Sequence, residues 1–201
     1  MFTGLIRECA EVLDFSANIL TLKAAHKPKI GDSICVNGAC LTVVFVGEGV
    51  FKVELSYESR GILALENLKG KVHIEPSLSL QDGLEGHLVQ GHVDGVGKIT
   101  KIEVKENSTD FYINVPKNLR LFMIPKGSVT IDGVSLTINE VGEDNIRLTI
   151  ISHTMKETLF YTYKVARAVN IESDMIARYL YNLSCKKTDE WAQIDRIMAI
   201  Y

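Results

Sequence analysis

Two short stretches of the sequence place thiol and hydroxyl side chains two positions apart. Cys40 and Thr42 lie in VNGACLTV, and Ser135 and Thr137 lie in IDGVSLTI. Residues two apart in a β-strand point to the same face, so each pair would share one face while the leucine between them points to the other. Thiols and hydroxyls can act as nucleophiles or relay protons. On the outer face of a sheet they can equally be solvated surface, so the spacing alone leaves both interpretations open.

Two of the five histidines lie in GHLVQGHVDG, residues 86–95. His87 and His92 are five positions apart and would face opposite sides of a continuous strand, so they could share a metal ion only across a bulge at Gly91. The four cysteines match no CxxC-type zinc pattern. We therefore expect no metal, and the alternatives for each histidine are a hydrogen-bonded structural role or contact with a ligand.

The elements that must position these residues are repeated within the chain. VNGACLTV recurs as IDGVSLTI at an offset of 95, KVHIE recurs as AVNIE at an offset of 97, and FTGLI matches VQGHV at an offset of 87, with Gly4 on Gly91. The change from 95 to 97 indicates that the first copy lacks two residues between Glu58 and Lys71. Self-similarity of this kind predicts two homologous units.

Each copy consists of short stretches of alternating apolar and polar residues, separated by turn signals such as Asn37-Gly38 and Asp132-Gly133. No strand pattern alternates with a long helical pattern, so we predict an all-β fold of two tandem antiparallel barrels. The predicted domains are an N-terminal barrel over 1–86, a C-terminal barrel over 87–172 and a helical segment over 173–201.

The helical segment carries an apolar stripe with helical periodicity. Its members are Met175, Ile176, Tyr179, Leu180 and Leu183, and Thr188 could cap a second short helix with Trp191, Ile194, Ile197, Met198 and Tyr201 on one face. Such a stripe must be buried, either against the same helix of other subunits or against the barrels of its own chain. We expect the first arrangement.

The charge balance argues against a nucleic-acid partner. The chain has 22 Lys and Arg against 25 Asp and Glu, a net charge of −3, and no basic run. The N-terminus lacks the features of a signal peptide, and no apolar run of about 18 residues occurs, so we expect no membrane partner and a cytoplasmic protein. In that reducing compartment the cysteines would be free thiols.

Several motifs together point to a known family. They are MFTGLI, GDSICVNGACLTV, GHLVQGHVDGVG, GSVTIDGVSLTI, SHTMKET and VNIESDMIARYL, in this order between Met1 and about Leu183. In these motifs the chain resembles the riboflavin synthase alpha-chain family. The resemblance implies a homotrimer in which each subunit has two tandem homologous closed six-stranded Greek-key β-barrels, followed by a C-terminal α-helix at the trimer contact.

The same resemblance implies a transferase without metal or cofactor. The implied reaction is the dismutation of two 6,7-dimethyl-8-ribityllumazine molecules, in which one donates a four-carbon unit to the other, giving riboflavin and 5-amino-6-ribitylaminouracil in the last step of riboflavin biosynthesis. One lumazine would lie on each barrel, and the active site would form between the N-terminal barrel of one subunit and the C-terminal barrel of its neighbour. Lumazine synthase is suggested as a further partner. The alternatives are a non-catalytic lumazine-binding or flavin-binding protein of the same fold, and a purely structural trimer.

The resemblance also implies which residues contact each ligand. The N-barrel ligand would contact Gly4, Leu5, Ile6, Cys40, Leu41, Thr42 and a strand formed by Glu54, Leu55, Ser56, Tyr57, Glu58 and Ser59. The C-barrel ligand would contact Gly91, His92, Val93, Ser135, Leu136, Thr137 and a strand formed by Thr149, Ile150, Ile151, Ser152, His153 and Thr154. The chain is two residues shorter than the family pattern after Ser59, so we expect an unusual loop beside the N-barrel ligand.

This chemistry suggests roles for individual residues. Cys40 and His92 would assist proton transfer or nucleophilic addition at the acceptor, where a thiolate is needed if sulfur attacks. Ser135 and Thr137 would hold or deprotonate the donor. Asp132 and Lys126 would stabilise charge on the donor ring, with Lys126 reaching a ligand on the adjacent subunit. His87 would be structural, at the junction between the barrels, and His92 would either reach Cys40 across a subunit boundary or serve the lumazine of its own barrel.

Overall fold

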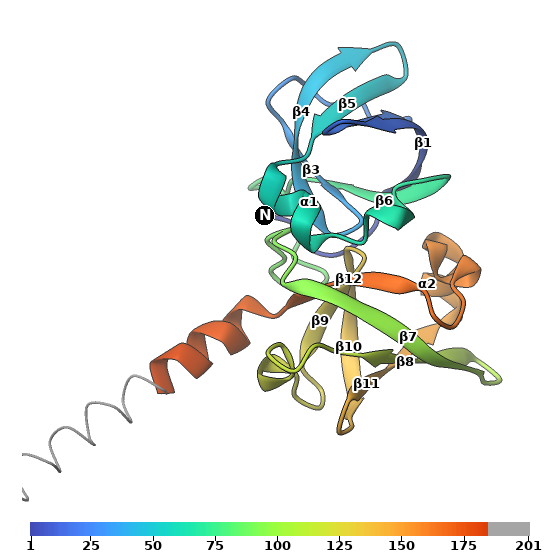
Figure 1. Cartoon of the computed structure of the whole chain (residues 1–201), viewed down its shortest axis with the longest axis vertical. Helices are drawn as coiled ribbons and strands as arrows, with labels where there is room; N and C mark the ends of the chain where they lie inside the picture. The colour runs from blue at the N-terminus through green and yellow to red at the C-terminus, as the bar shows by residue number, and fades with distance from the viewer. Residues whose placement is uncertain (185–201) are drawn as a thin grey trace, which may run out of the picture.

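The computed structural model describes residues 1–184, which form two closed antiparallel barrels (Figure 1). The first barrel contains β1 (Glu8–Ser16), β2 (Ile19–Lys23), β3 (Ser33–Val36), β4 (Ala39–Gly47), β5 (Val50–Glu54) and β6 (Lys71–Pro76), in the order β1-β2-β5-β4-β3-β6. The second contains β7 (Gly95–Val104), β8 (Ser108–Asn114), β9 (Ser128–Ile131), β10 (Val134–Val141), β11 (Asn145–Ile151) and β12 (Ala168–Ser173), in the order β10-β11-β8-β7-β12-β9. Both orders are the same closed Greek-key arrangement, which confirms the predicted fold class.

Helical structure is confined to short connections and to the end of the described chain. The short elements are α1 (Tyr57–Ile62), η1 (Leu65–Asn67), η2 (Arg120–Phe122), α2 (Ser152–Glu157) and η3 (Leu159–Thr162). Residues 175–184 form a helix that projects from the second barrel (Figure 1). No helix within residues 1–184 combines the length and the apolar character needed to cross a membrane. The second short helix predicted after Thr188 lies outside the described residues.

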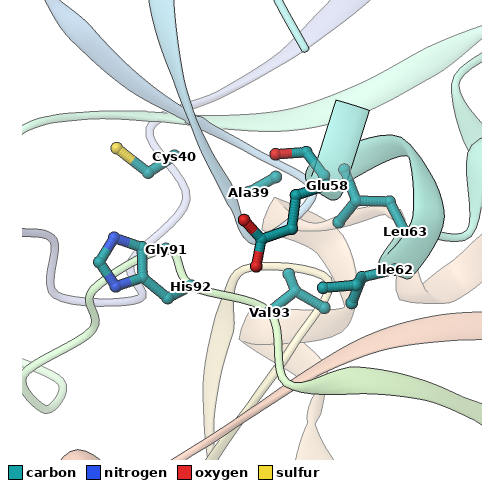
Figure 2. Close-up of a pocket in the computed structure, with 9 residues that line it drawn as sticks. Ala39, Cys40, Glu58, Ile62, Leu63, Gly91, His92 and Val93 are labelled. Carbon is teal, nitrogen blue, oxygen red and sulfur yellow. The ribbon is translucent and has the colours of Figure 1, made fainter. Parts of the chain in front are cut away.

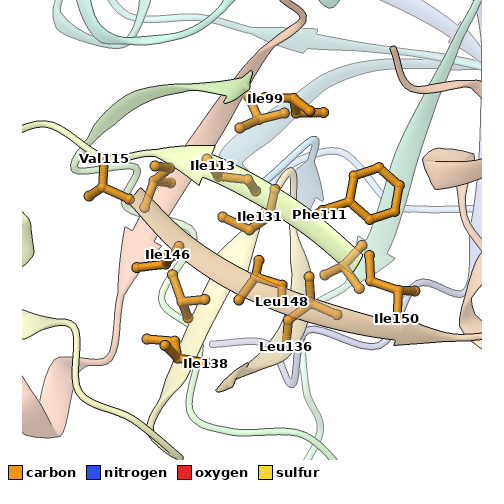
Figure 3. Packing of buried hydrophobic residues seen from close by; sticks show 14 of the residues in the cluster. Ile99, Phe111, Ile113, Val115, Ile131, Leu136, Ile138, Ile146, Leu148 and Ile150 are labelled. Carbon is orange, nitrogen blue, oxygen red and sulfur yellow. The ribbon is translucent and has the colours of Figure 1, made fainter. Parts of the chain in front are cut away.

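The barrel cores follow from the alternation of apolar and polar residues along the strands. In β4, Leu41 and Val43 are 4% and 1% exposed, whereas Cys40 and Thr42 point away from the core. The burial pattern of β10 begins in the same way, and Figure 3 shows its leucine and isoleucine within the core of the second barrel. The prediction that each polar pair lies outside its barrel is therefore confirmed.

The two-residue difference between the copies lies after the short helices. α1 and α2 both have six residues. The offset of 95 persists through Leu68 and Tyr163, whose N–H groups make equivalent hydrogen bonds to residues three positions earlier. The offset of 97 begins at Gly70 and Arg167, whose carbonyls accept equivalent hydrogen bonds from β1 and β7. The shortening thus lies beyond α1, between Leu68 and Gly70, and leaves that helix as long as its counterpart.

The two barrels contact each other through the turns between β3 and β4 and between β9 and β10. A Cβ atom on Gly38 would lie 3.0 Å from the backbone nitrogen of Gly133, so the two turns pack backbone to backbone. Beside them, the carboxylate of Asp132 accepts hydrogen bonds from the Tyr163 hydroxyl at 2.6 Å and from the Asn170 N–H at 2.8 Å. Asp132 is 0% exposed, so a polar cluster is buried between the barrels.

We expect Asp132→Asn to gain stability over the wild type as the pH rises from about 4 to 6. Burial raises the pKa of Asp132 from 3.8 to about 6, so in this window the native state keeps a proton that the unfolded state releases. The stability of the wild type therefore falls as the pH rises through this window. The Asp132→Asn variant has no such proton, so we expect it to be more stable than the wild type at neutral pH by about 1–3 kcal/mol.

Urea unfolding at several pH values measures this difference. Burial also lowers the pKa of His73 to about 4, which makes stability rise with pH in the same window. That contribution is common to both proteins and cancels in the comparison. A difference between variant and wild type that does not change between pH 4 and 7 would contradict the assignment.

Candidate functional site

A cavity of about 230 Å³ beside the first barrel brings together residues from both repeats (Figure 2). Its walls are Ala39, Cys40, Glu58, Ser59, Ile62, Leu63, Gly91, His92 and Val93. They come from the start of β4, from α1 and its C-cap, and from the segment that leads into β7. Figure 2 shows the side chains of Cys40 and His92 at one end of the cavity and those of Ile62 and Leu63 at the other, so the site has a reactive end and an apolar end.

A buried carboxylate holds the 90–92 segment against the first barrel. Glu172, on β12, accepts hydrogen bonds from the N–H groups of Gln90 at 2.7 Å, Gly91 at 2.9 Å and His92 at 3.1 Å. On the other side of the segment, the Gly91 carbonyl accepts a hydrogen bond from the Cys40 N–H at 2.7 Å. These bonds place the backbone of His92 next to that of Cys40 within one chain.

Gly91 fits this position because it lacks a side chain. Its φ is +75°, which L-residues rarely adopt, and a Cβ there would lie 2.7 Å from the Cβ of Cys40. Gly91, His92 and Val93, predicted to contact the ligand of their own barrel, line the cavity beside the other barrel within this chain. His92 also needs no subunit boundary to approach Cys40.

The start of the chain is held on the second barrel in the same way. Glu75, on β6, accepts hydrogen bonds from the Thr3 N–H at 2.7 Å and the Gly4 N–H at 3.0 Å, and the Gly4 carbonyl accepts one from the Ser135 N–H at 2.8 Å. Ile6 packs against the core of the second barrel. The segment 4–6, predicted to contact the ligand of the first barrel, thus lies against the second barrel, with Gly4 beside Ser135. In each repeat, the leading segment, which precedes the first strand of its barrel, packs against the barrel of the other repeat.

The two strands predicted to contact the ligands are shorter than expected. β5 ends at Glu54 and β11 ends at Ile151, and α1 and α2 follow. Ser56 caps α1, because its hydroxyl accepts a hydrogen bond from the Ser59 N–H at 3.0 Å, which favours a helical turn over an extended chain. The predictions of strands over 54–59 and 149–154 are wrong beyond those two ends, and the short helices turn Glu58 and Ser59 toward the cavity.

Apart from Gly4 and Gly91, which are buried, burial separates the predicted contact residues into two groups. Leu41, Leu55, Leu136 and Ile150 are between 1% and 9% exposed, so their side chains fill the cores and do not meet a ligand at the surface. The residues that reach the surface in whole or in part are Leu5, Ile6, Cys40, Thr42, Glu54, Ser56, Tyr57, Glu58, Ser59, His92, Val93, Lys126, Ser135, Thr137, Thr149, Ile151, Ser152, His153 and Thr154. Only Cys40, Glu58, Ser59, His92 and Val93 of this second group line the cavity beside α1.

Asp132 lies in a different place from the one predicted. Its carboxylate is enclosed between the barrels and already accepts two hydrogen bonds, so a ligand cannot reach it. This position does not support the predicted role of Asp132 in stabilising charge on a ligand. Lys126 is exposed on the second barrel with a φ of +67°, where a neighbouring chain could reach its ammonium group.

His87 has a more specific environment than the structural role predicted for it. Its Nδ1 lies 2.7 Å from Oγ of Ser135, and its Nε2 lies 3.3 Å from Oγ1 of Thr130. Burial lowers the pKa of this imidazole, and the negative charge of Asp174 partly offsets that effect. Asp174, which is not among the predicted site residues, precedes the 175–184 helix and accepts a hydrogen bond from the Ile176 N–H.

Metal binding finds no support within residues 1–184. No group of three or more His, Cys, Asp and Glu side chains in this part of the chain is placed to hold an ion. The segment of His87 and His92 is irregular, with only Val89 in a β-bridge, to Phe2. The imidazole of His87 lies beside Ser135, whereas that of His92 lines the cavity next to Cys40, so the two histidines belong to different sites.

Comparison with known proteins finds the same two-copy organisation. The lumazine binding domain family matches residues 3–76 and again residues 90–174. The riboflavin synthase of Bacillus subtilis (strain 168) is 38% identical over 202 residues, covering 96% of this chain and 94% of the relative. That of Bacillus amyloliquefaciens is 38% identical over 190 residues, covering 90% of this chain and 88% of the relative.

Solved structures support the fold. LumP complexed with riboflavin aligns with a TM-score of 0.78 and 23% identity, covering 86% of this chain and 99% of that one. LumP complexed with 6,7-dimethyl-8-(1'-D-ribityl) lumazine aligns with a TM-score of 0.75 and 22% identity over the same shares. These likenesses concern the fold alone, whereas the sequence relatives extend along nearly the whole chain. This chain, with its two lumazine binding domains, therefore belongs to the riboflavin synthase family.

Proposed function

We propose that this chain is an enzyme that converts two molecules of 6,7-dimethyl-8-ribityllumazine into riboflavin and 5-amino-6-ribitylaminouracil by transfer of a four-carbon unit. The observation that carries the proposal is the cavity that Cys40 and His92 both line, in a chain that is 38% identical to named riboflavin synthases. The apolar end of that cavity suits a flat ring system, its reactive end offers a thiol and an imidazole, and the Glu58 carboxylate lies between the two ends.

The proposed reaction needs groups of two kinds. A proton must leave the 7-methyl group of one lumazine, and a nucleophile or base must act on the other. Cys40 and His92 are proposed to act on the lumazine at the first barrel, and Ser135 and Thr137 on the lumazine at the second. Holding the two rings in register removes much of the entropic cost of bringing them together.

A non-catalytic lumazine-binding or flavin-binding protein is the second candidate, favoured by the likeness of the fold to LumP. Incubating the purified protein with 6,7-dimethyl-8-ribityllumazine separates the candidates. An enzyme releases riboflavin, a binding protein retains the lumazine unchanged, and a structural protein leaves it free. The proposal fails in the last two cases.

Substitutions at the cavity test the assigned residues. We expect Cys40→Ala and His92→Ala each to reduce turnover by about 100-fold, because each removes a group positioned for proton transfer or addition. Steady-state kinetics with the lumazine measures the loss. Full turnover with unchanged substrate affinity in both variants would show that these residues do not act as proposed.

We propose that three chains assemble through the 175–184 helix. In the single chain this helix leaves Ile176, Tyr179, Leu180 and Leu183 between 54% and 62% exposed, which supports burial against other copies. The helix is tied to its own chain at Arg178, which donates hydrogen bonds to Asp94 and Gln90, and at Tyr181, whose ring contacts that of Phe122. In such a trimer the N-terminal barrel of one subunit would face the C-terminal barrel of the next, with Lys126 reaching across.

A charge on the helix should disrupt that assembly. We expect Leu180→Asp to convert a trimer into monomers, because the aspartate cannot be buried among apolar side chains without a large desolvation cost. Sedimentation velocity measures the change. Val104→Asp is the matched control, since Val104 is 82% exposed at the end of β7. A Leu180→Asp protein that sediments like the wild type would rule out this contact.

We further propose a cytoplasmic protein with lumazine synthase as its partner. Cys9, Cys35 and Cys40 are free thiols, which suits a reducing compartment. A lumazine synthase would supply the proposed substrate at its source.

A further inference from the structure

The hydroxyl of Ser135 is hydrogen-bonded to the imidazole of His87, which has no role in the reaction proposed above. His87 Nδ1 lies 2.7 Å from Ser135 Oγ, a short distance for a hydrogen bond of this kind. Thr130 Oγ1 lies 3.3 Å from Nε2 on the opposite side of the ring. If Nε2 carries the ring proton and donates a hydrogen bond to Thr130, Nδ1 is left as the acceptor for the serine hydroxyl.

The position of His87 is held by several contacts. Its backbone N–H donates to the Thr3 carbonyl at 3.1 Å, and Thr3 is in turn held by the buried carboxylate of Glu75. A Cβ on Gly86 would lie 2.1 Å from the same Thr3 carbonyl and 3.1 Å from the Cβ of Ser135. The chain before His87 can therefore approach Ser135 so closely only because residue 86 is glycine.

This arrangement differs between the two repeats. At the offset of 95, Ser135 matches Cys40 and Thr130 matches Cys35. Among the described residues no imidazole is hydrogen-bonded to the Cys40 thiol, and His92, which shares its cavity, is exposed. A partly buried imidazole next to the hydroxyl thus distinguishes the second barrel from the first.

We propose that His87 accepts the Ser135 hydroxyl proton while Ser135 removes a proton from the 7-methyl group of the lumazine at the second barrel. This inference rests on the proposed function. The methyl C–H bond breaks and a new O–H bond forms on Ser135, while the original O–H bond breaks and an N–H bond forms at Nδ1. The electron pair delocalises into the lumazine ring, and the proton returns by the reverse path later in the cycle. Ser135 is the catalytic residue, and His87 is a positioning residue that acts through it.

The charges around His87 suit this role. Burial lowers its pKa, which keeps the ring neutral and able to accept a proton near neutral pH. The negative charge of the Asp174 carboxylate raises this pKa in part and stabilises the imidazolium once it forms. Glu172 lies opposite Thr130 in the sheet, but its carboxylate is bound to the 90–92 segment. Glu85 is exposed and paired with Arg7, so its effect is screened by solvent.

The variant His87→Gln distinguishes a proton relay, in which His87 takes up the proton of Ser135, from a purely structural hydrogen bond. The amide oxygen of His87→Gln can still accept the Ser135 hydroxyl hydrogen bond but cannot take up the proton. We expect kcat to fall by about 100-fold, with KM within about threefold of the wild type and with the acid limb of the pH profile lost. A structural role predicts nearly unchanged kcat and the same pH profile, and that result would overturn the proposal.

A double-mutant cycle and an isotope experiment complete the test. Adding His87→Gln to Ser135→Ala should cost no further activity, because both act in one transfer, whereas additive losses would count against the relay. Exchange of the 7-methyl protons in D2O, followed by NMR, should slow in His87→Gln. If the wild type binds the lumazine and exchanges these protons but forms no riboflavin, the proposed function fails while the relay stands.

Thr130→Val provides a further test if His87→Gln does not fold. It removes the hydrogen-bond partner of Nε2, so the ring proton is no longer held on that nitrogen, and kcat should fall several-fold. An unchanged kcat in this variant would refute the relay.

Discussion

Gly91→Ala is expected to lower turnover by about 100-fold and to destabilise the protein by about 2–4 kcal/mol. A side chain at φ +75° costs about 1–2 kcal/mol in strain, and the new Cβ would lie 2.7 Å from the Cβ of Cys40 and 2.8 Å from its backbone nitrogen. Relief of that overlap must move the 90–92 segment away from β4. Displacing a catalytic group by about 1 Å is enough for a 100-fold loss, and here both Cys40 and His92 shift.

Gly49→Ala provides the matched control. Gly49 also has a positive φ, of +67°, but nothing lies within 4 Å of the position where a Cβ would be. It should therefore lose about 1–2 kcal/mol from strain alone and keep its turnover. Kinetics and urea unfolding of both variants separate strain from displacement. If Gly91→Ala behaved like Gly49→Ala, the close contact between this segment and Cys40 would not matter for function.

Glu172→Ala is expected to cost about 3 kcal/mol of stability and most of the turnover. The substitution removes the carboxylate that accepts three backbone hydrogen bonds from Gln90, Gly91 and His92. Gly91 is buried, so its N–H would lose its partner without gaining water, and an unsatisfied buried donor costs about 1–3 kcal/mol. Without this support, His92 would no longer be held beside Cys40.

Glu172→Gln and Glu11→Ala show whether the carboxylate is the cause. Glutamine keeps one acceptor oxygen, so it should recover part of both losses. Glu11 is exposed and forms only a surface ion pair with Lys23, so its removal should change stability by less than about 1 kcal/mol and leave turnover intact. Urea unfolding and lumazine kinetics provide both measurements. Full activity in Glu172→Ala would show that the 90–92 segment does not depend on this support.

The features that could be read from the sequence are local ones. The outward direction of Cys40, Thr42, Ser135 and Thr137 follows from the alternation within a single strand, and the structure has that alternation. The barrels follow from the repeat of such strands. The ends of β5 and β11 were missed because short helices depend on caps such as Ser56, whose pattern is weak against a background of alternating residues.

The exchange of leading segments could not be read from periodicity, since it depends on hydrogen bonds between residues far apart in the sequence. Gly4 and Gly91 match in the repeat, and so do the two buried carboxylates Glu75 and Glu172 that hold their segments. This pairing of a glycine with an acidic residue was the available signal. The burial of Asp132 left no such sign, because a turn aspartate is normally exposed and only the packing of two barrels encloses it.

The most direct test of the proposed function is the stoichiometry of the reaction with 6,7-dimethyl-8-ribityllumazine. Lumazine consumed, riboflavin formed and 5-amino-6-ribitylaminouracil formed are followed together by chromatography at substoichiometric protein. A four-carbon transfer between two lumazines predicts that two are consumed for each riboflavin, with an equal amount of the uracil product. Lumazine that stays bound and unchanged through a long incubation would contradict it.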